Sequence, residues 1–111
     1  MRRFLPQGVM QHRDYFERLI QQIADAAAQI GALVGEGRLD EAERALDAAW
    51  SSVLNIKRHD VERLNDATVR LLLGAKAPYA GTLFEAQATI EEARGATSAA
   101  AALRARCERI P

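Results

Sequence analysis

The sequence predicts an all-α fold of about five helices, arranged as two antiparallel helix hairpins followed by a C-terminal helix. Three observations support this prediction. Apolar residues recur at intervals of three and four, which places them on one face of a helix. Glycines interrupt the periodic stretches and mark helix ends, at Gly35, Gly37, Gly74 and Gly95. A short block of sequence occurs twice, as expected of a protein built from repeated units.

Length and composition narrow the class further. A chain of 111 residues fits one domain, and we expect residues 1–11 to be an N-terminal arm and residues 12–111 a single helical domain. The 15 Lys and Arg equal the 15 Asp and Glu, which argues against a nucleic-acid binder that relies on a basic surface. The single cysteine favours a reducing compartment. The basic N-terminus lacks the apolar core of a signal peptide, and no apolar run is long enough to cross a membrane, so we expect a cytoplasmic protein.

The charges are unevenly distributed along the chain. Residues 1–13 contain three Arg and no acidic residue, whereas residues 14–47 contain eight acidic residues and three Arg. An acidic first hairpin next to a basic N-terminus would favour electrostatic self-association. The alternative is an ordinary solvated helical surface.

The first helix is predicted over residues 14–34. Its inner face is formed by residues at helical spacing, namely Phe16, Ile20, Ile23, Ala27, Ile30 and Val34. A strip of small residues accompanies it, formed by Ala24, Ala27, Ala28 and Gly31. Because small side chains allow another helix to approach closely, this strip is our candidate interaction face for a peptide or a second subunit; the alternative is packing within the domain against the third or fifth helix.

The second helix is predicted to begin near Asp40, where Asp40 and Glu43 have the spacing of a capping box. Its buried stripe consists of Leu39, Ala42, Leu46, Ala49 and Val53. The short glycine-containing turn before it makes the two helices an antiparallel hairpin.

Three more helices are predicted after this hairpin. The third covers residues 60–73, and a proline-containing loop follows over residues 75–81. Thr82 and Glu85 form a second capping-box pattern, which starts a fourth helix over residues 83–94. Ser98 can cap a last helix that ends at Ile110.

The repeated block aligns Gly37 with Gly81, 44 residues later, and extends over the following helix. The aligned residues are Gly37, Leu39, Ala42, Leu46 and Ala49 with Gly81, Leu83, Ala86, Ile90 and Ala93. This pattern resembles the tetratricopeptide repeat, which has a glycine in its inter-helix turn and two alanines flanking a bulky residue in its second helix. The resemblance covers residues 14–94 and implies helix hairpins in which these alanines face the first helix. The opening residues 14–20 also resemble the start of an uncharacterised family of bacterial tetratricopeptide-like proteins.

Candidate catalytic and metal-binding residues are few. His12 and His59 each lie near a carboxylate, but nothing brings the two together as a metal site requires. Cys107 has apolar spacing in the last helix, which favours packing over nucleophilic reactivity. We therefore predict no catalytic residue, no cofactor and no metal.

The leading hypothesis is a protein–protein interaction module that forms homodimers, with no nucleic-acid or membrane partner. Two hairpins make a very short repeat array, and such arrays usually need covered ends. The alternative is a small-ligand-binding protein or an enzyme, which would require a pocket that brings together His12, His59, Tyr79 and Cys107.

Overall fold

A computed structural model describes the backbone of residues 4–110 and the side chains of residues 13–110. No strand occurs in this described part, so the predicted all-α class is confirmed. The elements follow one another as α1 (Phe4–Gly35), α2 (Leu39–Val53), α3 (Arg58–Glu62), α4 (Asp66–Leu73), a single 3₁₀ turn (Gly74–Lys76), α5 (Ala77–Ala93) and α6 (Thr97–Arg109).

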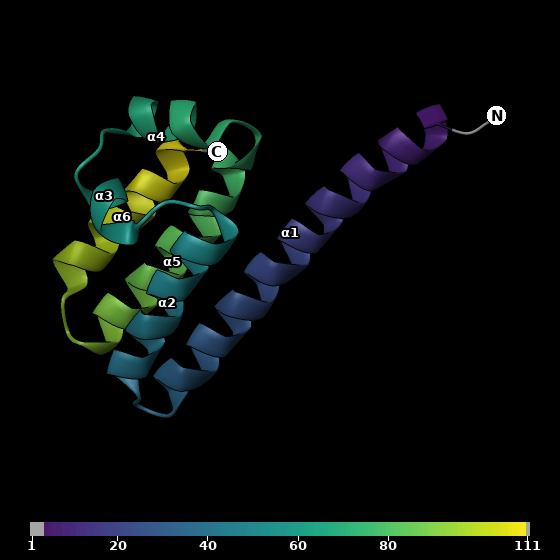
Figure 1. The fold of residues 1–111 in the computed structure, drawn as a ribbon. Helices are drawn as coiled ribbons and strands as arrows, with labels where there is room; N and C mark the ends of the chain where they lie inside the picture. Colours follow the sequence, from purple (N-terminus) through teal and green to yellow (C-terminus); the bar gives the residue numbers. More distant parts are fainter. Residues whose placement is uncertain (1–3, 111) are drawn as a thin grey trace.

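The helices form two antiparallel hairpins, α1 with α2 and α5 with α6 (Figure 1). Helix α5 packs against both α1 and α2, and the short helices α3 and α4 connect the hairpins. The core lies where α1, α2 and α5 meet, and its largest fully buried side chains include Trp50, Phe84, Ile30, Leu46, Leu83 and Ile90. This arrangement places α1 and α5 side by side, which positions the candidate site described below.

Helix α1 is longer than predicted and extends beyond the bundle. It begins at Phe4 and not near Asp14, and its 32 residues exceed the 15 of α2. Pro6 does not prevent this because it lies in the first turn, where no intrahelical N–H bond is needed. The first third of α1 points away from the other helices (Figure 1). The helix thus includes residues 4–11 of the predicted arm, and residues 1–3 lie outside the described part.

Both hairpins are closed by the same turn. Gly37 and Gly95 have φ values of 76° and 85°, which favour glycine. The amide of Arg38 donates to the carbonyl of Leu33 at 2.9 Å, and the amide of Ala96 donates to that of Glu91 at 2.8 Å. With the bonds that the two glycine amides make, this is the Schellman arrangement of a helix C-terminus. The equivalent turns are therefore at Gly37 and Gly95.

The second hairpin is consequently formed by later segments than predicted. Gly81, aligned above with Gly37, lies inside α5 and not in a turn. Pro78 lies in the first turn of α5, where proline starts a helix, so the predicted loop over residues 75–81 is wrong. Thr82 and Glu85 do not form a cap because α5 begins at Ala77, and the N-cap of α6 is Ala96, not Ser98.

The predicted third helix is split into α3 and α4. Asn65 interrupts it, because its side chain accepts a hydrogen bond from the amide of Thr68 at 2.8 Å. An asparagine cap of this kind satisfies an otherwise unpaired N–H and starts a new helix. The break separates α3 from α4, and Arg106 of α6 hydrogen-bonds to a residue of each.

Arginines fasten α6 and α3 to the rest of the fold. Arg106 donates to Asp66 at 2.7 Å and to the backbone carbonyls of Val61 and Leu64. Arg58 of α3 binds Glu43 of α2 at 2.8 Å. These contacts hold the connecting segment between the hairpins.

The repeat alanines behave differently in the two hairpins. Ala42 and Ala49 are buried, as the repeat pattern predicts for α2. Ala86 is also buried, but Ala93 is exposed at the end of α5. The prediction that Ala93 packs inside its hairpin is therefore wrong, because the α5–α6 turn comes directly after it.

Ala49→Leu is expected to lower the free energy of unfolding by about 1–3 kcal/mol, because a buried position in a close-packed core has no room for added carbons. Ala48→Leu is the matched control, since Ala48 is the residue directly before Ala49 in α2 and is exposed. Urea denaturation of both variants measures the difference. Equal losses for the two would contradict the burial of Ala49 against α1.

Candidate functional site

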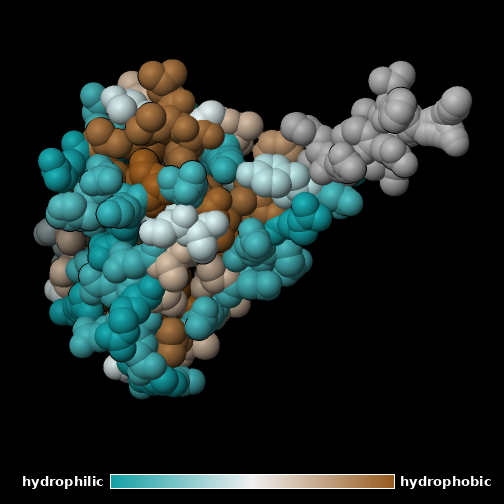
Figure 2. Space-filling view, in the orientation of Figure 1, coloured by the Kyte–Doolittle hydropathy of each residue, from teal (hydrophilic) through white to brown (hydrophobic). Residues whose placement is uncertain are grey.

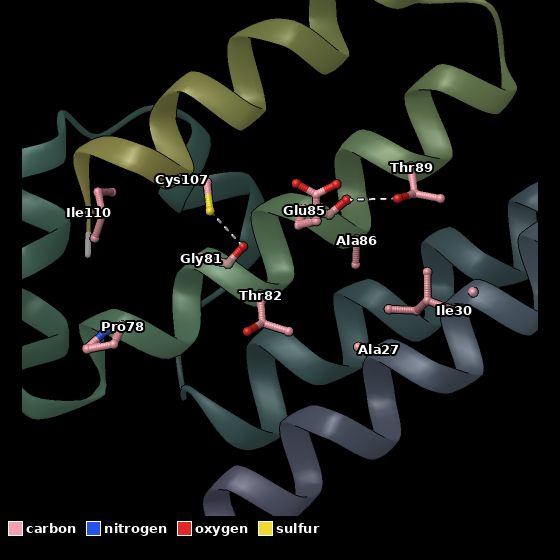
Figure 3. Close-up of a pocket in the computed structure, with 11 residues that line it drawn as sticks. Ala27, Ile30, Pro78, Gly81, Thr82, Glu85, Ala86, Thr89, Cys107 and Ile110 are labelled. Carbon is pink, nitrogen blue, oxygen red and sulfur yellow. Dashed lines mark hydrogen bonds between the residues drawn. The ribbon is translucent and has the colours of Figure 1, made fainter.

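A groove of about 550 Å³ lies between α1 and α5 and is closed at one side by the end of α6 (Figure 3). Helix α1 contributes one wall, α5 the floor, and α6 the opposite wall. The lining residues are mostly apolar or small, namely Ala27, Ile30, Gly31, Pro78, Gly81, Thr82, Glu85, Ala86, Thr89, Cys107 and Ile110. Such a lining favours an apolar occupant.

Most of the α5 side chains that line the groove are small, namely those of Gly81, Thr82, Ala86 and Thr89. A Cβ added at Gly81 would lie 3.2 Å from the Cys107 Sγ, which shows how closely α6 approaches α5 at this point. The Cys107 thiol donates to the Gly81 carbonyl at 3.3 Å. Gly81 thus allows a close helix contact that forms one end of the groove.

The candidate interaction face is only partly in the groove. Ala27 and Gly31 line it, whereas Ala24 and Ala28 are exposed on the same flank of α1 and do not line it. The space beside Gly31 is open, since no atom lies within 4 Å of a Cβ built on it. Ala27 is half-buried, whereas Ala24, Ala28 and Gly31 are exposed, so the other described helices leave most of this strip uncovered.

The α5 residues of the groove were missed by the sequence reasoning. Pro78 and Thr82 were assigned to a loop and a cap, although both lie within α5. The available signal was Pro78 itself, because proline is common in the first turn of a helix. That signal would have moved the predicted start of the fourth helix towards the N-terminus. Thr82, four residues after Pro78, would then lie on the same helix face as Pro78.

The polar groups of the groove are held by other residues. Glu85 accepts a hydrogen bond from Arg104 at 2.9 Å, and the Thr89 hydroxyl donates to the Glu85 backbone carbonyl at 3.1 Å. Burial raises the pKa of the Cys107 thiol, and the nearby carboxylates of Glu85 and Glu108 raise it further. The thiol is therefore protonated near neutral pH, which is unfavourable for a nucleophile.

Cys107 is expected to react several-fold more slowly with a disulfide reagent at pH 8 than an exposed cysteine. Its raised pKa leaves little thiolate, and the rate should keep rising as the pH passes the ordinary value of 9.0. The matched control is the double variant Ala101→Cys, Cys107→Ser, which moves the thiol to an exposed position on α6. A thiol at position 107 that reacts as fast as the control would contradict this pKa shift.

The other sequence candidates do not meet in the groove. His59 is exposed on α3, and Tyr79 packs against the core from α5 without lining the groove. The side chain of His12 lies outside the described residues. Among the described side chains, no three His, Cys, Asp or Glu residues are close enough to hold a metal ion together. The pocket that the enzyme alternative requires is therefore not formed by His59, Tyr79 and Cys107.

Large apolar side chains are exposed elsewhere on the surface. Tyr15 and Ile20 of α1 are 41% and 50% exposed, and Leu71 and Leu72 of α4 are 81% and 59% exposed. Figure 2 shows apolar residues gathered at the end of the molecule where α4 lies. In the part of the chain that was searched, no helix combines the length and apolar character needed to cross a membrane.

Comparison with known proteins gives no relative: no family model, no curated protein and no solved structure matches this chain. The tetratricopeptide-like resemblance therefore stays a prediction. It rests on the first hairpin, where Gly37 is in the turn and Ala42, Leu46 and Ala49 are buried.

Proposed function

We propose that this chain is a protein-interaction module, of tetratricopeptide-like design, that associates with a second copy through the α1–α5 groove. The observation that carries the proposal is the open groove between two helices, with an apolar lining and a floor of small residues. A groove of this kind suits the apolar face of another helix. The single cysteine supports a cytoplasmic setting.

A second copy is favoured as the occupant by the surface of α1. Ile20 is a large apolar residue that is 50% exposed, and by helical spacing it lies on the same side of α1 as Ala27 and Gly31, with the exposed Ala24 and Ala28 next to it. Two copies related by a two-fold axis would cover this flank on both chains with one self-complementary contact. The basic residues 1–13 and the acidic residues 14–47 supply charges of opposite sign for such a pair.

The test is the molar mass of the full chain in solution, measured by size-exclusion chromatography with light scattering over a range of concentrations. We expect a species of twice 12.2 kDa. The variant Gly31→Arg places a long charged side chain in the groove, where nothing obstructs its Cβ, and should weaken the dimer at least tenfold. A wild-type chain that stays monomeric at all concentrations would overturn the proposal.

Gly35→Arg is the matched control. Gly35 is also exposed on α1 with nothing within 4 Å of a built Cβ, but it does not line the groove. It should therefore leave the dimer unchanged. If both variants weaken association equally, added charge on α1 matters and the groove does not.

A small apolar ligand is the second candidate occupant. Its support is the volume of about 550 Å³, which lies in the range of small-molecule pockets. An apolar compound that raises the melting temperature of wild type and not of Gly31→Arg, without changing the molar mass, would favour this function over self-association.

A further inference from the structure

We propose that the element filling the groove is the N-terminal extension of α1, residues 4–14, from the second copy, so that two chains exchange these extensions reciprocally. This inference rests on the proposed self-association and adds which segment binds and in which direction. The observation behind it is that α1 continues past the bundle while the groove beside it is left open (Figures 1 and 3).

The lengths of the extension and the groove agree. At about 1.5 Å per residue, residues 4–14 span about 15 Å of helix, and the groove floor over residues 78–89 spans about 16 Å. The extension leaves the bundle at the end where α5 begins (Figure 1). A partner's extension would therefore enter the groove from that end and run antiparallel to the receiving α1.

This direction closes the assembly as a dimer. When each α1 runs antiparallel to the other, the two-fold axis passes near the point where the helices leave their bundles. Ile20 lies in this stretch of α1 and is 50% exposed in a single chain. The exchange would bury it near the centre of the contact, and each extension would occupy the other chain's groove, so that this contact closes with two copies.

The sequence of the extension has the character that the groove requires. Within the extension, Leu5 and Val9 lie four residues apart and therefore share a helix face, and Phe16 and Ile20 continue this spacing just after it. They continue the apolar pattern of α1 that, further along, includes the buried Ile23 and Ile30. An apolar stripe of this kind complements a groove lined by alanine, glycine and isoleucine.

The charges at the groove favour the same segment. Glu85 lines the groove, and Glu108 is exposed on α6 next to Cys107. Glu17 is exposed on α1. The extension and the residues before it include Arg2, Arg3 and Arg13 and only one acidic residue, Asp14. Because Arg104 already pairs with Glu85, Glu108 is the carboxylate that the basic segment of the other copy would approach, and this attraction should weaken in high salt.

The test uses Cys107, the single native cysteine, which lines the groove. In the full-length variant Val9→Cys, we expect a disulfide between position 9 of one copy and Cys107 of the other on mild oxidation at alkaline pH. Non-reducing electrophoresis detects the linked dimer, and peptide mapping identifies the two positions. Arg44→Cys, on the exposed face of α2, is the control. Its yield of the dimer linked through Cys107 should be at least tenfold lower than that of Val9→Cys.

The outcomes separate this inference from the proposed function. Loss of the linked dimer in the double variant Val9→Cys, Cys107→Ser confirms the pairing with Cys107. A dimer by light scattering that gives no link between positions 9 and 107 overturns the exchange of extensions and leaves self-association standing. A monomer by light scattering overturns both.

Discussion

Trp50→Ala is expected to lower the free energy of unfolding by about 3–5 kcal/mol. Trp50 is fully buried in α2, and its ring lies 5.4 Å from the ring of Phe84 in α5, with the planes tilted by 56°. It therefore links the two hairpins across the centre of the core, and alanine would leave a large cavity there. Urea denaturation followed by far-ultraviolet circular dichroism measures the loss, since the variant lacks the single tryptophan that fluorescence would report.

Trp50→Phe is the control for this cavity. The indole Nε1 is buried without a hydrogen-bond partner among the described residues, so phenylalanine removes an unpaired polar group while keeping most of the ring. We expect a loss below about 1.5 kcal/mol, as for swaps between large apolar residues. If Trp50→Phe cost as much as Trp50→Ala, the Trp50 Nε1 would have to make a contact that the structure does not contain.

The first hairpin could be predicted from sequence because its signals are local. The spacing of Ile23 and Ile30, the glycine turn and the buried Ala42 and Leu46 all depend on residues within one or two helical turns. The N-terminal limit of α1 was wrong because the expected start was placed where the clearest periodicity begins. The helix continues to Phe4 through residues with weaker periodicity.

The second hairpin could not be predicted because its repeat signal is ambiguous. A glycine followed by an alanine-containing helix fits a turn at Gly37, but at Gly81 it serves close packing against Cys107. The equivalent of Gly37 in the structure is Gly95, and Ala42 corresponds to Ala100, which is also buried, but a later core position differs in chemistry. Leu46 in α2 corresponds to Arg104 in α6, which binds Glu85 and Glu92 and is not a core residue. Sequence similarity therefore does not mark the true pair of turns.

Only one side of the groove could be predicted from the sequence. Ala27 and Gly31 follow from the small-residue strip on α1, whose C-terminal part was predicted correctly. The opposite side depends on where α5 begins, for which Pro78 was the local signal, and on α5 lying beside α1, which no local pattern specifies. Cys107 was predicted to be a packed residue, and the structure adds that it lies at the end of the groove.

Arg106→Ala is expected to lower the free energy of unfolding by about 2–4 kcal/mol, the sum of lost charged hydrogen bonds and a lost cation–π contact. The Arg106 side chain is only 13% exposed and binds Asp66 at 2.7 Å. It also donates to two carbonyls at the end of α3 and lies 5.1 Å from the Phe84 ring centre. Its removal would release α6 from α3 and α4 together, and urea denaturation measures the loss.

Two control variants separate the guanidinium geometry of Arg106 from its charge. Arg106→Lys keeps the positive charge but lacks the planar fork that binds a carboxylate and two carbonyls at once, so it should lose more than half as much as Arg106→Ala. Arg109→Ala removes the other arginine that binds Asp66, but this side chain is 58% exposed, and the expected loss is about 0–1 kcal/mol. If Arg109→Ala lost as much free energy of unfolding as Arg106→Ala, the positive charge beside Asp66 would be what holds α6 in place, and the hydrogen bonds of Arg106 would not. If Arg106→Ala and Arg106→Lys both lose much of the free energy of unfolding and Arg109→Ala does not, α6 is held by the hydrogen bonds that only a buried guanidinium can make.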